Sequence, residues 1–392
     1  MTAPPSAGGA GPAQAVAALP GASLRGRSDS LAVCDDCLRR ADLVAAVAGL
    51  LDIEWRRRSA PARVLSLADE ELIALDPTGR VARRHADFSP ALARRRIAAA
   101  ALAAACRCAA GYPDALRALA DPPAVLHIAG RAEALAVEPA VAIVGARRGT
   151  SYGQEVARGL GTRQAGVPVV SGLAIGVASA AHVGALQRPG AAPVAVLAGG
   201  ADVPYPASKR RLYAAILERG CVVSELPPGF TAYRWCFVAR NRLIAGLADL
   251  TVVVEAAERS GSLTTADFAA QLGRPVGAVP GAVTSRFSSG TNLLLASGAA
   301  VVRDARDVLD HVLGPGHELA LAPSAAGAGD ALEPRLRRVL DAIERGHGSL
   351  AELAPDPSAA PQVLQDLTAL ELRGLVRREF GGRYVRSLET RA

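Results

Sequence analysis

Short, mostly apolar runs alternate with amphipathic helical patterns through the middle of the chain. Seven runs are rich in β-branched residues: Val141–Val144, Val167–Val170, Val194–Leu197, Cys221–Val223, Leu250–Glu255, Val276–Val279 and Ala300–Val302. Helical patterns lie between them, over 153–165, 178–188, 207–219, 239–247, 263–272 and 290–297. Runs of this kind are typical of strands buried between two helical layers. The alternation predicts an α/β fold over residues 121–315, with a Rossmann-like, doubly wound, mostly parallel sheet.

The sequence ahead of this block has two other patterns. Residues 1–30 are rich in Ala, Pro and Gly, which predicts a disordered tail with no export signal. Residues 31–120 predict an N-terminal helical domain, with helices over 38–51 and 91–110.

The sequence after the block predicts a linker and a small C-terminal domain. Residues 316–332 form the Pro/Gly/Ala-rich linker. Residues 333–392 predict a winged-helix domain, with helices over 333–344, 349–353 and 359–373 followed by a hairpin.

The charge balance of the 392 residues is compatible with nucleic-acid binding but does not by itself indicate it. The formal net charge is +7, and Lys209 is the only lysine, so arginine carries nearly all the positive charge. No apolar run reaches the roughly 18 residues of a membrane-spanning helix. These features predict a cytoplasmic protein with reduced cysteines, and no motif indicates a cofactor.

Two cysteine pairs leave two interpretations open. Cys34 and Cys37 have a Cys-x-x-Cys spacing, and Cys106 and Cys108 have a Cys-x-Cys spacing. Together they supply four thiolates, the number that a structural zinc site needs. The pairs lie far apart in sequence on predicted helices, so buried, unreactive thiols suit the pattern equally well.

The turns after the predicted strands carry glycine, serine and threonine. Glycine lets a ligand approach the backbone, and the start of the following helix offers N–H groups to an anion. Arg147, Lys209, Arg240 and Arg242 lie beside these turns. Because parallel strands end at one edge of a sheet, the sequence predicts a phosphate-binding surface there.

The motifs of common nucleotide enzymes and hydrolases are missing. The first turn lacks Gly-x-Gly-x-x-Gly, the chain lacks Gly-Lys-Ser/Thr, and no strand-to-helix turn carries Gly-x-Ser-x-Gly. His182 is interpreted as structural, and Glu225 and Glu255 as partners that order the arginines. A protein that is not an enzyme is therefore favoured. An enzyme or sensor of a nucleotide-derived small molecule is the alternative, and a scaffold that has lost a nucleic-acid site is a third.

An ordered series of motifs points to a known family. It comprises 141–147 (VAIVGAR), 170–176 (VSGLAIG), 202–206 (DVPYP), 240–246 (RNRLIAG), 253–255 (VVE), 260–266 (SGSLTTA) and 279–281 (VPG). This series resembles the DNA-processing protein A family, also called Smf. The resemblance implies a homodimer that binds single-stranded DNA, protects incoming DNA in natural transformation and loads RecA recombinase onto it, with no known enzymatic reaction.

The resemblance and the turn chemistry together give a set of expected DNA contacts: Gly145, Arg147, Ser171, Gly172, Lys209, Arg240, Asn241, Arg242, Ser260, Gly261, Ser262 and Thr265. Tyr152, Tyr205, Trp235 and Phe237 are expected to stack on bases or to pack in the core. The chain departs from the family pattern in having Ala146 for a hydroxyl residue, Ala178 for an acid and Val238 for a proline.

Overall fold

The computed structural model describes residues 32–52, 65–162, 166–188, 190–315, 332–373, 375–378 and 382–386. The predicted tail over 1–30 and almost all of the predicted linker lie outside these ranges. No helix in the described part of the chain is both long and apolar enough to cross a membrane.

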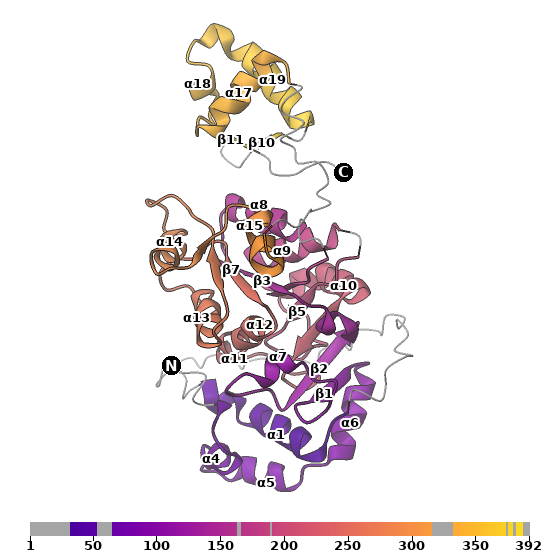
Figure 1. Cartoon of the computed structure of the whole chain (residues 1–392). Helices are drawn as coiled ribbons and strands as arrows, with labels where there is room; N and C mark the ends of the chain where they lie inside the picture. Colours follow the sequence, from indigo (N-terminus) through magenta and orange to yellow (C-terminus); the bar gives the residue numbers. More distant parts are fainter. Residues whose placement is uncertain are drawn as a thin grey trace, which may run out of the picture.

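A nine-stranded sheet forms the centre of the fold, in the order β1-β2-β6-β5-β4-β3-β7-β8-β9 (Figure 1). The strands are β1 (Ala103–Cys106), β2 (Val125–Gly130), β3 (Val141–Val144), β4 (Val169–Gly172), β5 (Val194–Val196), β6 (Cys221–Ser224), β7 (Leu250–Val253), β8 (Val276–Ala278) and β9 (Ala300–Val301). Neighbours from β6 through β9 pair in parallel, and β1 and β2 add an antiparallel edge. All seven predicted runs form strands, so the predicted α/β fold with a mostly parallel sheet is confirmed.

Helices cover both faces of the sheet because successive strand residues point to opposite sides. Val141 and Ile143 face one layer, formed by α8 (Ser151–Thr162), α9 (Val177–Leu186) and α15 (Ala305–Leu313), beside which lies α10 (Arg210–Arg219). Ala142 and Val144 face the other layer, which includes α7 (Asp114–Arg117), α12 (Asn241–Gly246) and α13 (Leu263–Gln271). Three further elements lie at the strand ends: η2 (Ala207–Lys209), α11 (Arg234–Ala239) and α14 (Ser289–Ala296).

The N-terminal region packs around the β1–β2 edge of the sheet (Figure 1). Its helices are α1 (Asp35–Ala46), α4 (Asp69–Ala74), α5 (Arg80–Ala86) and α6 (Pro90–Ala99). The helix predicted over 91–110 is wrong in its second half. The chain leaves the helix at Ala101, whose φ is 53°, and Ala103–Cys106 then pairs with β2. Alanine favours helices locally, but here pairing with β2 and burial of small side chains outweigh that propensity.

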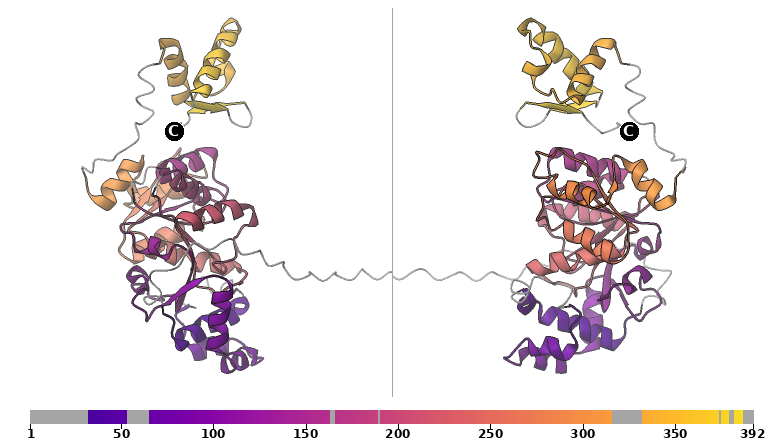
Figure 2. Two further views of the ribbon diagram at one scale, coloured as in Figure 1. Left: turned by 90° about the vertical axis from the view of Figure 1, so that its right-hand side faces the viewer. Right: turned by 60° about the vertical axis from the view of Figure 1, so that its left-hand side comes forward.

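The C-terminal region has its own small core and stands apart from the sheet in Figure 2. It contains α17 (Pro334–Glu344), α18 (Leu350–Leu353) and α19 (Ala360–Leu372), and an antiparallel pair of β10 (Val376–Arg378) and β11 (Tyr384–Arg386). These are the helices and the hairpin that the sequence predicted. Arg377 Nη2 lies 3.0 Å from Glu155 Oε2 of α8, an ion pair between the two parts.

Candidate nucleic-acid interface

The strand order reverses between β3 and β7, where α/β sheets commonly bind ligands. The turn after β3 lies between the ends of two other strand connections. Ala146 N–H donates to the carbonyl of Glu255 after β7 (2.7 Å), and the carbonyl of Ala146 accepts from Val177 N–H after β4 (3.3 Å). Three connections that are far apart in sequence therefore meet at one edge of the sheet.

Gly145 allows this close meeting of backbones. A Cβ at Gly145 would lie 2.9 Å from both Cγ atoms of Val177 and 3.0 Å from the carbonyl oxygen of Glu255. A side chain at this position would push the turns apart. Gly145 therefore shapes the turn through packing.

The first turn of α8 already holds an anion, the carboxylate of Glu255. Glu255 Oε2 accepts from the backbone N–H of Thr150 (2.8 Å), and Oε1 accepts from Thr150 Oγ1 (2.6 Å). Thr150 Oγ1 in turn accepts from Gly153 N–H (3.1 Å). The sequence predicted that Glu255 orders an arginine and that this helix start is open to phosphate. The structure instead pairs Glu255 with Thr150, since the buried carboxylate takes the N–H that a phosphate would use.

Arg240 is a buried cation at the carboxyl ends of β4 and β5. Its side chain donates to the carbonyl of Val196 and, from Nε, to Asn241 Oδ1 (3.3 Å). Burial, reinforced by the like charge of Arg147, lowers the pKa of Arg240 to about 10. No carboxylate among the described residues pairs with Arg240. A buried guanidinium without an acidic partner would be stabilised by a bound anion.

Asn241 connects Arg240 to the turn after β7. Its Nδ2 donates to the carbonyl of Gly261 (3.0 Å) and to Thr264 Oγ1 (2.8 Å). In the same turn, the hydroxyls of Ser260 and Ser262 lie 2.8 Å apart. The structure thus brings Arg240, Asn241 and the 260–264 turn together.

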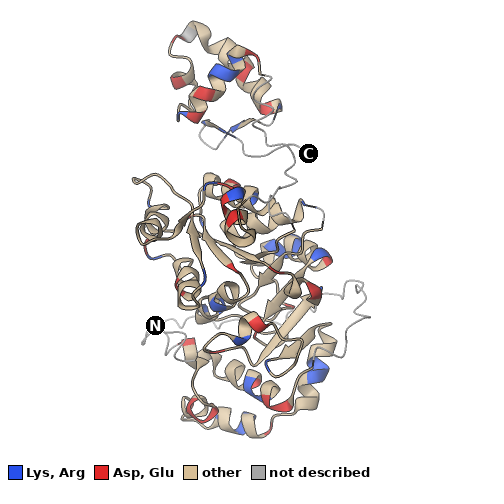
Figure 3. Cartoon of the chain, in the orientation of Figure 1, with Lys and Arg blue, Asp and Glu red and all other residues tan. Residues whose placement is uncertain are grey.

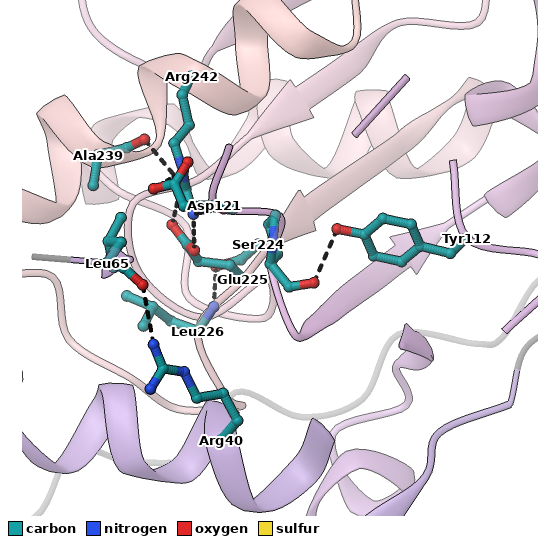
Figure 4. Close-up of polar contacts among 10 residues, drawn as sticks. Arg40, Leu65, Tyr112, Asp121, Ser224, Glu225, Leu226, Ala239 and Arg242 are labelled. Atoms are coloured by element: carbon teal, nitrogen blue, oxygen red, sulfur yellow. Dashed lines mark hydrogen bonds and ion pairs between the residues drawn. The ribbon is translucent and has the colours of Figure 1, made fainter. Parts of the chain in front are cut away.

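Arg242 lies in a buried ion-pair cluster beside the carboxyl end of β6 (Figure 4). Its guanidinium donates to both carboxylate oxygens of Glu225 (2.8 and 2.7 Å) and, from Nε, to Asp121 (3.0 Å). Its side chain is only 3% exposed. Burial pulls the pKa of Arg242 down, but the two carboxylates outweigh it, so the pKa is raised. The sequence expected Arg242 to touch DNA; its donors are instead bound to these internal partners, and Glu225 orders an arginine as predicted.

Three other expected contact residues differ in their accessibility. Ser171 is fully buried and its hydroxyl donates to the carbonyl of Ile143 (2.6 Å). Thr265 is 1% exposed in α13. Lys209 is half-buried in η2, just ahead of α10, at the end of the β5 connection. Of these three residues, only Lys209 has a side chain that is accessible to a ligand.

Arg147 and the rings of Phe237 and Tyr205 form a stack at this edge, in which Phe237 is half-buried. The guanidinium of Arg147 lies 4.8 Å from the ring centre of Phe237, and Phe237 lies 5.3 Å from the ring of Tyr205 at an angle of 56°. Arg147 is exposed and Tyr205 is 54% exposed. A cation above aromatic rings is a platform for both phosphate and base. Tyr152 is also exposed, whereas Trp235 is buried and belongs to the core.

A second aromatic pair, Phe230 and Tyr233, was not predicted from the sequence; the ring centres lie 6.1 Å apart. Both residues belong to the connection after β6, and the carbonyl of Phe230 accepts from Gly200 N–H after β5 (2.9 Å). A local signal was present, because residues 230–237 hold four aromatics in a chain that is only 4% aromatic. The positions of the basic residues did not indicate this edge, because Lys and Arg occur on helices throughout the described part of the chain (Figure 3).

Comparison with known proteins identifies the family. The family model for DNA recombination-mediator protein A matches residues 104–313, just over half of the chain. The chain belongs to this family. The family resemblance stated from the sequence motifs is therefore confirmed.

Individual members of the family are similar over longer stretches. The chain is 43% identical over 258 residues to the putative DNA processing protein DprA of Mycobacterium tuberculosis, a match that covers 64% of this chain and 66% of that protein. It is 36% identical to protein Smf of Escherichia coli, covering 70% and 75%. The X-ray structure of DprA from Streptococcus pneumoniae superposes with a TM-score of 0.56 and 30% identity, covering 70% of this chain and 95% of that one.

Proposed function

We propose that this family member binds single-stranded DNA along the carboxyl edge of its parallel sheet, without catalysing a reaction. The observation that carries the proposal is the stack of Arg147, Phe237 and Tyr205 beside the strand-order reversal. Single-strand binding proteins combine phosphate contacts with aromatic rings on which any base can stack. The stack supplies both, which supports binding that tolerates any sequence.

Arg240 adds a second cation below the stack. Its lowered pKa is still far above neutral, so the guanidinium stays charged. In the proposal, a backbone phosphate approaches Arg240 at the carboxyl ends of β4 and β5, where the missing side chain of Gly172 leaves room for the guanidinium to pack against the strand. Asn241 fixes the position of Arg240 relative to the Ser260–Ser262 turn. Lys209 contacts the DNA strand at the carboxyl end of β5. Arg242 acts as a positioning residue that fixes α12.

The side chains that would serve as catalytic bases are already engaged. Glu255 is bound to Thr150, and Glu225 is bound to Arg242. His182 is completely buried in α9, and burial lowers its pKa to about 4. These placements support a binding protein over an enzyme or sensor of a nucleotide-derived small molecule.

We further propose the cellular role that the family resemblance implies. The chain would act as a homodimer that protects incoming DNA in natural transformation and loads RecA recombinase onto it. The C-terminal region would be a winged-helix module. Its helix α19 carries the acidic residues Asp366 and Glu371, and its nearest basic residue is Arg373 at its C-terminal end. This charge pattern favours a protein partner over duplex DNA.

Competition binding tests the proposed function. A fluorescent oligo-dT strand is titrated with the full chain and followed by anisotropy, with unlabelled single strand or duplex of equal length as competitor. The proposal predicts that the single strand competes far better than the duplex. Equal competition by duplex, or no binding at low salt by folded protein, would overturn it. A RecA arm, measuring DNA-dependent ATP hydrolysis by RecA with and without the chain, tests the loading role separately.

A further inference from the structure

Four cysteines from two distant segments surround one point beside the β1 edge. Cys34 directly precedes α1 and Cys37 lies in its first turn, whereas Cys106 ends β1 and Cys108 lies in the turn that follows. Packing of α1 against the sheet brings these pairs together, although 72 residues separate Cys34 from Cys106.

The sulfur atoms lie close enough together to serve as four ligands of one metal ion. All four Sγ atoms lie within 4.8 Å of one another. The Cys37–Cys108 pair is 3.7 Å apart and the Cys34–Cys106 pair is 3.9 Å apart. Zinc binds thiolates at about 2.3 Å, which places two ligands of a regular tetrahedron about 3.8 Å apart. A disulfide would need a separation of about 2.05 Å.

The surroundings suit a negatively charged metal–thiolate centre. The backbone N–H of Cys34 points to Cys106 Sγ (3.5 Å), as N–H groups do around metal-bound sulfur. Arg107 and Arg40 line the same hollow as Cys34, Cys37 and Cys108. Cys108 is exposed and Cys34 is half-buried, so an ion can enter from solvent.

We propose that Cys34, Cys37, Cys106 and Cys108 bind a structural zinc ion that fastens α1 to the edge of the sheet. Four protein ligands close the coordination sphere, which fits a structural site and leaves no position for a substrate. This zinc site is separate from the proposed DNA interface, because it consists of the four cysteine sulfurs and includes no residue of that interface.

The proposed zinc site also supports the position of the helix that carries the aromatic stack. Past the opposite, C-terminal end of α1, the carbonyl of Ala48 accepts from Trp235 Nε1 (2.8 Å) and Asp52 accepts from Trp235 N–H (3.3 Å). Trp235 lies at the start of α11, the helix that carries Phe237. Fastening α1 at its cysteine end therefore supports the helix that holds the stack.

Metal analysis of the full chain tests the proposal. The protein is produced with zinc in the medium, purified with a reductant and without a chelator, and analysed by mass spectrometry for metals. We expect about one zinc ion per chain. Cys37→Ser and Cys106→Ser should lose most of it, and Cys236→Ala, which removes a buried thiol of another cluster, should keep it.

A second measurement does not depend on whether the serine variants fold. Wild-type protein is loaded with Co²⁺ in place of zinc, and its absorption is recorded. The strong visible bands of tetrahedral cobalt and the thiolate charge-transfer bands are expected together. Wild-type protein without bound zinc and without these bands would overturn the proposal. Stoichiometric iron with visible absorption, or intact mass showing two disulfides, would overturn it in favour of a cluster or a redox pair.

Discussion

Gly172 leaves room for the guanidinium of Arg240: a Cβ built on Gly172 would overlap Cζ, Nη1 and Nη2 of that arginine. Arg240 has no space to retreat, because it is buried and bonded to Val196 and Asn241. Gly172→Ala should therefore displace the guanidinium and weaken single-strand binding by roughly 1.5–3 kcal/mol, the worth of hydrogen bonds to a charged group. Anisotropy titration with oligo-dT measures the loss.

Gly159→Ala is the matched control for this substitution. Gly159 lies in helix α8, and a Cβ there would meet nothing within 4 Å. It should leave DNA affinity unchanged and raise the free energy of unfolding by up to about 1 kcal/mol, since alanine favours helices over glycine. Equal affinity in both alanine variants would show that Arg240 does not contact DNA.

Arg147→Ala and Arg242→Ala should separate binding from stability. Arg147 is exposed, so its loss should lower DNA affinity and leave the free energy of unfolding within about 0.5 kcal/mol. Arg242→Ala would leave Asp121 and Glu225 buried without a cation, which costs roughly 3–5 kcal/mol of stability. Urea denaturation and anisotropy on both variants provide the comparison. A stable Arg242→Ala protein that no longer binds DNA would contradict its assignment as a positioning residue.

Tyr205 should contribute to binding through its ring. Tyr205→Ala removes the exposed ring of the stack and should weaken oligo-dT binding by about 1–3 kcal/mol. Tyr205→Phe keeps the ring and should bind like wild type. If the phenylalanine variant loses as much as the alanine variant, the hydroxyl is the contact and stacking is not.

Two buried histidines should make the fold sensitive to mild acid. Burial lowers the pKa of His127 and of His182 from 6.5 to about 4. Between these values the unfolded chain binds protons that the folded chain does not, so stability is lost as pH falls below about 6.5. Each histidine should cost about 2 kcal/mol at about pH 5 relative to about pH 8. Urea denaturation of His182→Leu and His127→Leu should each show a shallower pH dependence than wild type; an unchanged dependence in both would contradict this account.

The local pattern of the sequence predicted the parallel strands, because short β-branched runs such as Val141–Val144 are typical of buried strands. It did not predict β1. Ala103–Cys106 is rich in alanine, and only pairing with β2, visible in three dimensions, makes it a strand. The motif string also placed the predicted site at the carboxyl edge of the sheet, since parallel strands all end there.

The fate of individual site residues could not be predicted in the same way. Arg240 and Arg242 are two residues apart in one motif, yet Arg240 is bonded to Asn241 and to the carbonyl of Val196, whereas Arg242 is bonded to Asp121, which is 121 residues away in sequence. The choice between exposed contact and buried ion pair depends on which carboxylates the fold brings close. The same holds for Glu255, whose partner Thr150 is 105 residues away.

The most direct test of the central claim is the salt dependence of oligo-dT binding by the wild-type chain, Arg147→Ala and Arg219→Ala. Arg219 is also an exposed arginine, at the C-terminal end of α10 toward the opposite edge of the sheet, where it donates to the carbonyl of Leu186 (2.6 Å). The account predicts that wild-type affinity falls steeply with salt and that Arg147→Ala reduces the slope of log K against log salt by about 0.7, the value for one lost phosphate contact. Arg219→Ala should match wild type. Equal slopes for all three proteins, or binding by wild type that does not respond to salt, would contradict a DNA interface at this edge.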